Sequence, residues 1–297
     1  MNRNPPPHIL ETALAVSAPS TRHQRMGQIL VQSGRLASED VDRILALQAT
    51  SGKRFGQLGQ ELGLLTADDV RFALSVQFDY PYLSPQAKLA PELVMAHSPE
   101  SAAAEQWRGL RSQLVLRGLS NAGVPQRLAV LSPDRKEGRS VAAANLAIAW
   151  AQMGRRTLLI DADLRQPRQH QLFNLGQAAG LSDWLAGRSM SEGVKPIAGL
   201  RGLSVLSAGT PAPNPQELLS QPQMSQLLQS LGEEHDLMVL DSPAASQCSD
   251  ALHVAAHCGA ALLLAHRDVS SLPRLLQLSQ GLRDLGVRAI GTVLRES

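Results

Sequence analysis

Six residues between positions 138 and 241 have the types and the spacing of a phosphate and metal site. Three are carboxylates that end or closely follow short apolar segments: Asp161, Asp163 and Asp241. The others close a polar turn that leads into a helical pattern: Gly138, Arg139 and Ser140. Phosphates bind to backbone N–H groups where a helix begins, and Mg²⁺ prefers oxygen ligands. We therefore predict phosphate contacts at the turn and, if a nucleotide binds, a Mg²⁺ site at Ser140, Asp161 and Asp241.

The segments around these residues alternate between short apolar runs and helical patterns, which is typical of a parallel β-sheet covered by helices. Predicted strands cover 127–131, 157–161, 203–206, 237–241, 260–265 and 289–294. Predicted helices cover 140–153, 215–231, 249–256 and 271–285. Ligands of such sheets bind at the carboxyl ends of the strands, where the polar residues lie. The predicted fold class is therefore α/β.

The part of the chain that contains these segments resembles the cytoplasmic kinase domain of bacterial tyrosine kinases, the BY-kinases that work with polysaccharide co-polymerases. The resemblance covers about residues 98–294 and rests on several blocks in the family's order. They are LLIDADLR at 158–165, GLSDWLAG at 180–187, NPQELL at 214–219, VLDSP at 239–243, and an E-x-x-R-x-x-R motif of Glu105, Arg108 and Arg111. The resemblance implies a P-loop NTPase-like sheet, ATP and Mg²⁺ as ligands, homo-oligomerisation through that motif, and a membrane polysaccharide co-polymerase as partner.

The phosphate loop departs from the family's pattern, S-x-x-P-G-x-G-K-S/T. Arg135 replaces the Pro, Lys136 the first Gly and Arg139 the Lys, while Gly138 and Ser140 remain. A side chain at a left-handed backbone position costs about 1 to 2 kcal/mol. The planar fork of arginine also differs from the compact ammonium of lysine. We therefore expect a pseudokinase with weak or no ATP turnover.

Two further departures concern the substrate tail and the base contact. No Tyr follows Tyr82, whereas the family ends in a tyrosine-rich tail, and Arg295 stands where related folds place an adenine-contacting Asn. One alternative is an active tyrosine autokinase or ATPase of the chain-length control system, with Asp161, Asp163, Asp241 and Arg139 as its catalytic residues. Another is a positioning ATPase of the ParA and MinD type, which shares the fold but lacks the motif at 105–111.

The first part of the chain contains an internal repeat. Residues 25–48 align without gaps with residues 54–77. Polar and glycine positions also match: Arg25 with Arg54, Gly27 with Gly56, Gly34 with Gly63, and Gln48 with Gln77. A helical docking module needs only matching apolar positions, whereas paired arginines can contact guanine edges or phosphates. The repeat therefore favours a small all-α domain for a two-fold ligand, with glycines that let the backbone approach it.

The repeat resembles the cyclic-di-GMP-binding N-terminal domain of type II secretion and type IV pilus ATPases, the MshEN domain. In that family two 24-residue motifs joined by five residues bind one ligand molecule. The resemblance implies that the eight matched residues contact cyclic-di-GMP. Gly59 stands where the family has Leu, so a side chain expected to shield a ligand base is absent.

Composition and chain order complete the prediction. The 28 Lys and Arg nearly balance the 26 Asp and Glu, which argues against nucleic acid as a partner. No apolar run is long enough to cross a bilayer, so we expect a cytoplasmic protein held at the inner membrane by its partner. The expected parts are a disordered tail 1–24, the tandem-repeat domain 25–83, a linker 84–104 and the BY-kinase-like domain 105–297. The predicted function is a cyclic-di-GMP-responsive, catalytically degenerate regulator of exopolysaccharide biosynthesis and export.

Overall fold

The computed structural model describes residues 25–78, 83, 88–119, 126–176, 178–188 and 193–296. The chain divides between residues 80 and 81 into two compact units. Within the described ranges, no helix combines the length and apolar character needed to cross a membrane. The expected tail 1–24 and Tyr82 lie outside the described residues.

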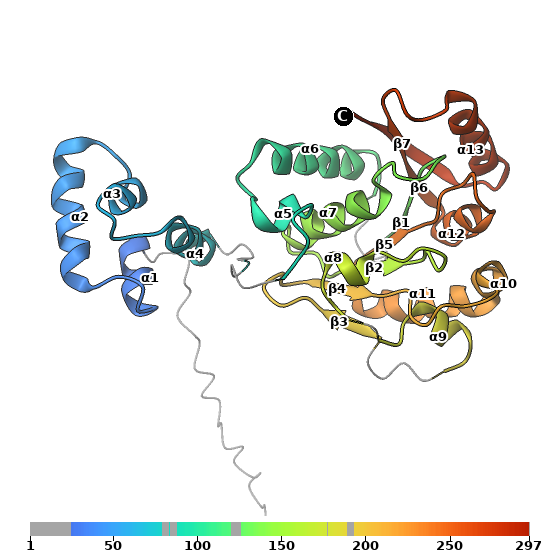
Figure 1. The fold of residues 1–297 in the computed structure, drawn as a ribbon, viewed down its shortest axis with the longest axis horizontal. Helices are drawn as coiled ribbons and strands as arrows, with labels where there is room; N and C mark the ends of the chain where they lie inside the picture. The colour runs from blue at the N-terminus through green and yellow to red at the C-terminus, as the bar shows by residue number, and fades with distance from the viewer. Residues whose placement is uncertain are drawn as a thin grey trace, which may run out of the picture. The chain divides into compact units, whose positions relative to one another are not determined.

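The second unit is built on a seven-stranded sheet (Figure 1). In spatial order its strands are β3 (Val194–Pro196), β4 (Leu203–Leu206), β2 (Thr157–Asp161), β5 (Leu237–Asp241), β1 (Gln126–Leu131), β6 (Ala260–His266) and β7 (Arg288–Arg295). All neighbours pair in parallel except β3 and β4. Strands β2 and β5 are buried along their whole length, because helices cover both faces of a parallel sheet.

Two layers of helices cover the two faces of the sheet. One apolar core lies under α5 (Val94–His97), α6 (Ala102–Leu116), α7 (Arg139–Ala151) and α8 (Gln169–Leu172). The other lies under α9 (Leu181–Leu185), α10 (Pro215–Ser220), α11 (Pro222–Glu234), α12 (Asp250–Cys258) and α13 (Leu272–Asp284). Successive strand residues alternate between them, so Leu158 and Ile160 face one core and Leu159 the other. The predicted helix 215–231 is two helices, because Pro222 has no N–H to continue α10 and instead begins α11.

The described part of the stretch 84–104 is not the linker that we expect from its composition. The side chains of Leu93 and Met95 are completely buried in the second unit. The side chain of Asn145 in α7 accepts a hydrogen bond from the N–H of Met95 at 3.0 Å and donates one to the carbonyl of Glu92 at 3.0 Å. These contacts attach α5 to α7, so the second unit begins well before residue 105.

The first unit contains four helices in its described residues. They are α1 (Met26–Gln32), α2 (Ser38–Ser51), α3 (Phe55–Glu61) and α4 (Ala67–Phe78). Their shared core is made of Ile29, Leu30, Leu36, Ile44, Leu58, Leu65 and Ala73. The short helices α1 and α3 both have seven residues and begin directly after Arg25 and Arg54.

Candidate functional site

The carboxyl ends of β1, β2 and β5 bring the predicted polar residues together. Asp161 and Asp241 are direct neighbours in the β2–β5 register, and both are completely buried. The side-chain amide of Gln169 donates to Oδ2 of Asp241 at 2.8 Å and to the carbonyl of Ser140 at 3.0 Å. The role of Gln169 could not be predicted from the sequence, because this residue lies in no recognisable motif. It connects the carboxylates to the first turn of α7.

Arg139 does not point out of the phosphate loop. The residue is only 8% exposed, and its Nε donates to the carbonyl of Ser242 at 2.8 Å. Its Nη1 donates to Oγ of Ser132 at 2.6 Å and to the carbonyl of Asp134 at 2.8 Å. Its Nη2 lies 3.9 Å from Oδ2 of Asp163. The arginine that we expect to contact phosphate therefore binds the loop to which it belongs.

The rest of the loop is also bound by its own side chains. Glu137 is completely buried and accepts a hydrogen bond from the N–H of Asp134 at 2.8 Å and another from the hydroxyl of Ser270. The backbone is left-handed at Lys136, with a φ of 62°, and at Gly138, with a φ of 86°. A phosphate loop needs free N–H groups directed at the anion. In this loop the N–H of Asp134 is directed at a carboxylate instead.

The buried carboxylates have strongly perturbed proton affinities. Burial raises the pKa of Asp241 to about 6, and hydrogen bonds and the charge of Arg139 offset the effect only in part. Burial, with repulsion from Asp241, holds the pKa of Asp161 well above its ordinary value. Removing a carboxylate from water disfavours its charged form unless a cation or donors compensate. Each of these two carboxyl groups therefore favours its neutral form more than an ordinary aspartate does.

Mg²⁺ fits only part of this arrangement. Oδ1 of Asp241 is buried without a hydrogen-bond donor and could bind a cation. Asp161, however, already accepts hydrogen bonds from the N–H groups of Asp163, Arg168 and Gln169. No three His, Cys, Asp or Glu side chains within the described ranges form a metal-binding group. Magnesium at kinase sites depends on substrate phosphates for its remaining ligands, and the side chain of Arg139 is bound to Ser132, Asp134 and Ser242 instead of being free for a phosphate. The residues as placed do not fit Mg²⁺ with ATP.

The E-x-x-R-x-x-R residues of α6 lie on the surface of the second unit, and two of them also contact their own chain. Arg108 forms an ion pair with Glu105 at 2.8 Å and donates to the carbonyl of Pro99. Arg111 donates to the carbonyl of Ala149 at 2.8 Å, which ties α6 to α7. Only Glu105 is largely exposed, at 73% of its side chain.

The glycines of the repeat are explained by helix packing and by turn geometry. A Cβ on Gly27 would lie 3.1 Å from Cγ1 of Val41, and one on Gly56 would lie 3.1 Å from Cγ1 of Val70. The two glycines of the turns, Gly34 and Gly63, have φ values of 69° and 68°, which favour glycine over other residues. The close approach that we assigned to a ligand is, in the described structure, an approach between helices.

The polar members of the repeat remain accessible. The side chains of Arg25 and Arg54 are exposed and form no ion pair with any other described residue. Gln48 and Gln77 are half-buried, and Gln48 donates to the carbonyl of Lys53 at 3.2 Å. The first Arg of each unit is thus free to contact a ligand.

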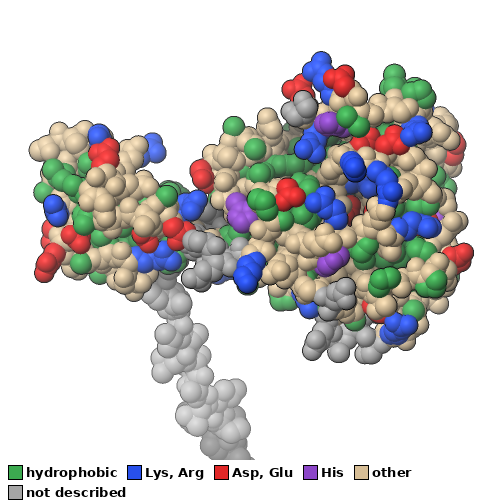
Figure 2. Space-filling view, in the orientation of Figure 1, with side chains coloured by type: hydrophobic (Ala, Val, Ile, Leu, Met, Phe, Trp, Pro, Cys, Tyr) green, Lys and Arg blue, Asp and Glu red, His purple; other side chains and the backbone are tan. Residues whose placement is uncertain are grey.

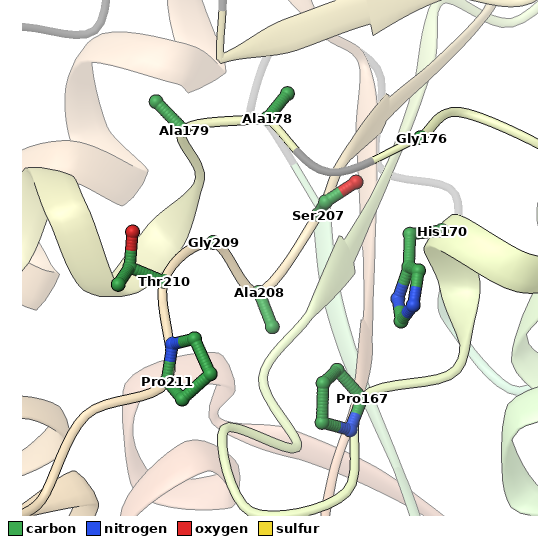
Figure 3. Close-up of a pocket in the computed structure, with 10 residues that line it drawn as sticks. All are labelled: Pro167, His170, Gly176, Ala178, Ala179, Ser207, Ala208, Gly209, Thr210 and Pro211. Atoms are coloured by element: carbon green, nitrogen blue, oxygen red, sulfur yellow. The ribbon is translucent and has the colours of Figure 1, made fainter.

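A cavity that the sequence analysis did not predict lies beside α8, near the end of β4. It has a volume of about 340 Å³. Figure 3 shows Pro167 and His170 on one side and the segment from Ser207 to Pro211 on the other. Its lining is mostly small and apolar, and no motif marks it.

In the space-filling view, basic side chains gather near the middle of the larger unit (Figure 2).

Comparison with known proteins identifies the family of the second unit. No family model matches the sequence. The tyrosine-protein kinase YwqD of Bacillus subtilis is 32% identical over 165 residues, which are 56% of this chain and 69% of YwqD. The chain belongs to the bacterial tyrosine-kinase family, the BY-kinases.

Other members agree with this assignment. The tyrosine-protein kinase etk of Escherichia coli is 32% identical over 197 residues, which are 66% of this chain but only 27% of etk. The solved kinase domain of E. coli ETK matches with a TM-score of 0.65 and 29% identity, covering 72% of this chain and 82% of that structure. The BY-kinase P-loop fold predicted for the second unit is therefore confirmed, and the identity favours a BY-kinase over the ParA and MinD alternative.

Proposed function

We propose that this BY-kinase-related chain is a cyclic-di-GMP-responsive, catalytically degenerate regulator of exopolysaccharide synthesis and export. The observation that carries the degeneracy is the side chain of Arg139, which binds the carbonyl of Asp134 in its own phosphate loop and the carbonyl of Ser242 after β5. The altered loop sequence at Arg135 and Lys136 supports the same conclusion. The described structure and the sequence thus favour a regulatory role over ATP turnover.

The geometry of the repeat supports a ligand with two equivalent halves. A Cβ on Gly27 would lie 3.3 Å from Cζ of Phe55, and one on Gly56 would lie 3.5 Å from Sδ of Met26. The starts of α1 and α3 are therefore adjacent, and the exposed Arg25 and Arg54 directly precede them. Cyclic-di-GMP carries two phosphates and two guanines, and a guanidinium fork suits either group. Each arginine would contact one half of the ligand.

The family supports the proposed setting. Relatives of the chain are tyrosine-protein kinases, and one of them is described as a putative tyrosine-protein kinase in the cps region of Klebsiella pneumoniae. One solved structure that matches 75% of this chain is the chimerical protein CapA2B2, which supports a partner protein. We propose a membrane polysaccharide co-polymerase as that partner, a cytoplasmic location beside the inner membrane, and a homo-oligomer in which Glu105, Arg108 and Arg111 contribute to assembly.

Calorimetry with the full chain tests the ligand. We expect saturable binding of cyclic-di-GMP that is lost when Arg25→Ala and Arg54→Ala are combined. Arg43→Ala is the matched control, because Arg43 is an exposed arginine of the same unit outside the matched positions. Absence of saturable binding to the wild-type chain, or equal binding by the double variant, would overturn the proposal.

One observation favours an active tyrosine autokinase or ATPase as a second candidate. Oδ1 of Asp241 is buried and lacks a donor, as expected of a group that binds a cation. In that case Asp161, Asp163 and Asp241 would hold Mg²⁺ and Arg139 would turn toward the phosphates. Phosphate release above background that disappears in Asp161→Ala would support this candidate.

A further inference from the structure

The phosphate loop is fastened to four separate parts of the second unit. Arg139 joins it to the end of β5 through the carbonyl of Ser242 and approaches the loop after β2 through Asp163. Glu137 joins it to the segment after β6 through Ser270. Arg274 of α13 forms an ion pair with Asp134 of the loop at 2.5 Å.

We infer that Arg139 takes the place of a bound metal cation, so that this loop keeps one ordered, closed conformation whether or not Mg²⁺ and ATP are supplied. The inference rests on the catalytic degeneracy proposed above and adds its physical cause. It does not depend on cyclic-di-GMP. The chemistry is that of a tethered cation: a side chain supplies the positive charge and the hydrogen bonds that close the loop.

The hydrogen-bond acceptors around Arg139 explain why its side chain stays in the loop. A buried guanidinium is stable only where acceptors or carboxylates compensate for lost water. Arg139 has two backbone carbonyls and the hydroxyl of Ser132 at 2.6 to 2.8 Å. Its charge also lowers the pKa of Asp241, against the larger effect of burial. Displacing the side chain would leave the carbonyl of Ser242 without the donor of Arg139 and the carboxylates without a nearby cation.

One buried anion of the loop also opposes a phosphate at the N–H of Asp134. The carboxylate of Glu137 is completely buried and bonds the N–H of Asp134. A phosphate at this N–H would have to replace a buried anion, and like charges in a buried site repel strongly. At Asp134 the loop therefore binds its own side chains on both groups: the N–H donates to Glu137 and the carbonyl accepts from Arg139.

A second arginine covers the loop from the last strand. A Cβ on Gly138 would lie 2.8 Å from Nη1 of Arg295, so that guanidinium lies directly against the glycine that begins α7. Arg295 ends β7, the edge strand next to β6. The position where related folds contact adenine is thus occupied by a side chain that covers the loop.

Melting and binding measurements on the full chain test this inference. We expect Mg²⁺ with ATP to leave the melting temperature of the wild-type chain unchanged within about 1 °C, because a ligand that does not bind cannot stabilise. Arg139→Ala should lower the melting temperature of the second unit by about 5 °C, as expected when several buried hydrogen bonds are lost. Arg135→Ala is the matched control, because Arg135 is an exposed arginine of the same loop, and it should melt like the wild type.

The variant Arg139→Lys tests the closure without removing the charge. A lysine cannot reach all four groups that the guanidinium contacts, so the loop should open and bind Mg²⁺ with ATP at least about tenfold more tightly than the wild type. Arg139→Ala melting like Arg135→Ala would overturn the inference. So would saturable ATP binding by the wild type that weakens in Arg139→Lys.

Hydrogen exchange of the wild-type chain keeps the test independent of variant folding. We expect the amides of 132–140 to be protected equally with and without Mg²⁺ and ATP, and protection that appears only with ATP would contradict the closed loop. ATP binding without ATP hydrolysis would contradict this inference but would not contradict the proposed catalytic degeneracy. Failure of cyclic-di-GMP to bind would remove the proposed ligand and leave the closed loop unaffected.

Discussion

At the scale of single residues, the second unit differs from an ordinary phosphate site in the way its charges are compensated. Asp161 and Asp241 are buried side by side, and their neighbours Arg139 and Gln169 belong to the chain itself. The types and order of the acidic residues could be predicted from the sequence. The roles of Glu137 and Gln169 could not, because they depend on side-chain direction rather than on spacing.

The buried Asp241 predicts an unusual pH dependence of stability. Its pKa is raised to about 6 from an ordinary value of 3.8, so the folded chain holds a proton that the unfolded chain releases between these values. The wild type therefore loses stability as pH rises through this window, and the loss is complete above about pH 6.

Asp241→Asn should remove that loss. In EDTA at pH 7.5 we expect the variant to be more stable in denaturant titration by on the order of 2 kcal/mol, with the difference shrinking as pH falls toward 4. Gln169 can still donate to the new amide oxygen, which makes the substitution conservative. A variant less stable than wild type at pH 7.5 would contradict the raised pKa.

Gly59 gives a second prediction at this scale. It matches Leu30 of the first repeat unit, and the sequence comparison indicates that a side chain shielding a ligand base is absent at this position. A Cβ on Gly59 would lie 2.8 Å from Cγ of Leu65, so Leu65 already fills the space. Gly59→Leu, which restores the repeat, should therefore destabilise the first unit by about 1 to 3 kcal/mol through overpacking.

Thermal melting measures this effect. Gly109→Ala is the control, because a Cβ on Gly109 meets nothing within 4 Å and alanine favours a helix over glycine. We expect the control to melt at the wild-type temperature or above it. A higher melting temperature for Gly59→Leu would show that the space beside Leu65 is open after all.

At the scale of elements, periodicity predicts the buried strands well. The bounds of β2, β4 and β5 agree with the sequence to the residue, because each is a short apolar run that ends in a polar or turn signal. The three-residue strand β3 and the short helices α5, α8 and α9 are not predicted. Elements of three to five residues are too short to show a period, and they form only because tertiary contacts hold them.

The attachment of α5 to α7 gives the prediction at this scale. The side chain of Asn145 bonds the backbone of Glu92, Met95 and Val141. Asn145→Ala should leave buried backbone groups unpaired, at a cost of about 2 kcal/mol, and should expose the segment 88–97 to limited proteolysis. Gln113→Ala on the exposed side of α6 should have no effect. Equal cleavage rates in both variants would mean that the segment is held by other contacts.

At the scale of the whole molecule, the chain joins a helical unit with two exposed arginines to a BY-kinase fold in which side chains of the chain bind the phosphate loop. The sequence predicts both units and the family of the second. It does not predict that the stretch 84–104 belongs largely to the second unit. Leu93 and Met95 are buried in the core of that unit, but their neighbours in the sequence are rich in Pro, Ala and Ser, which indicate a linker.

The most direct test of the account is calorimetry with cyclic-di-GMP and with Mg²⁺ and ATP on one preparation of the full chain. We predict saturable binding of cyclic-di-GMP at one ligand per chain and no saturable binding of ATP. Saturable ATP binding together with no detectable cyclic-di-GMP binding would contradict the account and favour an active kinase.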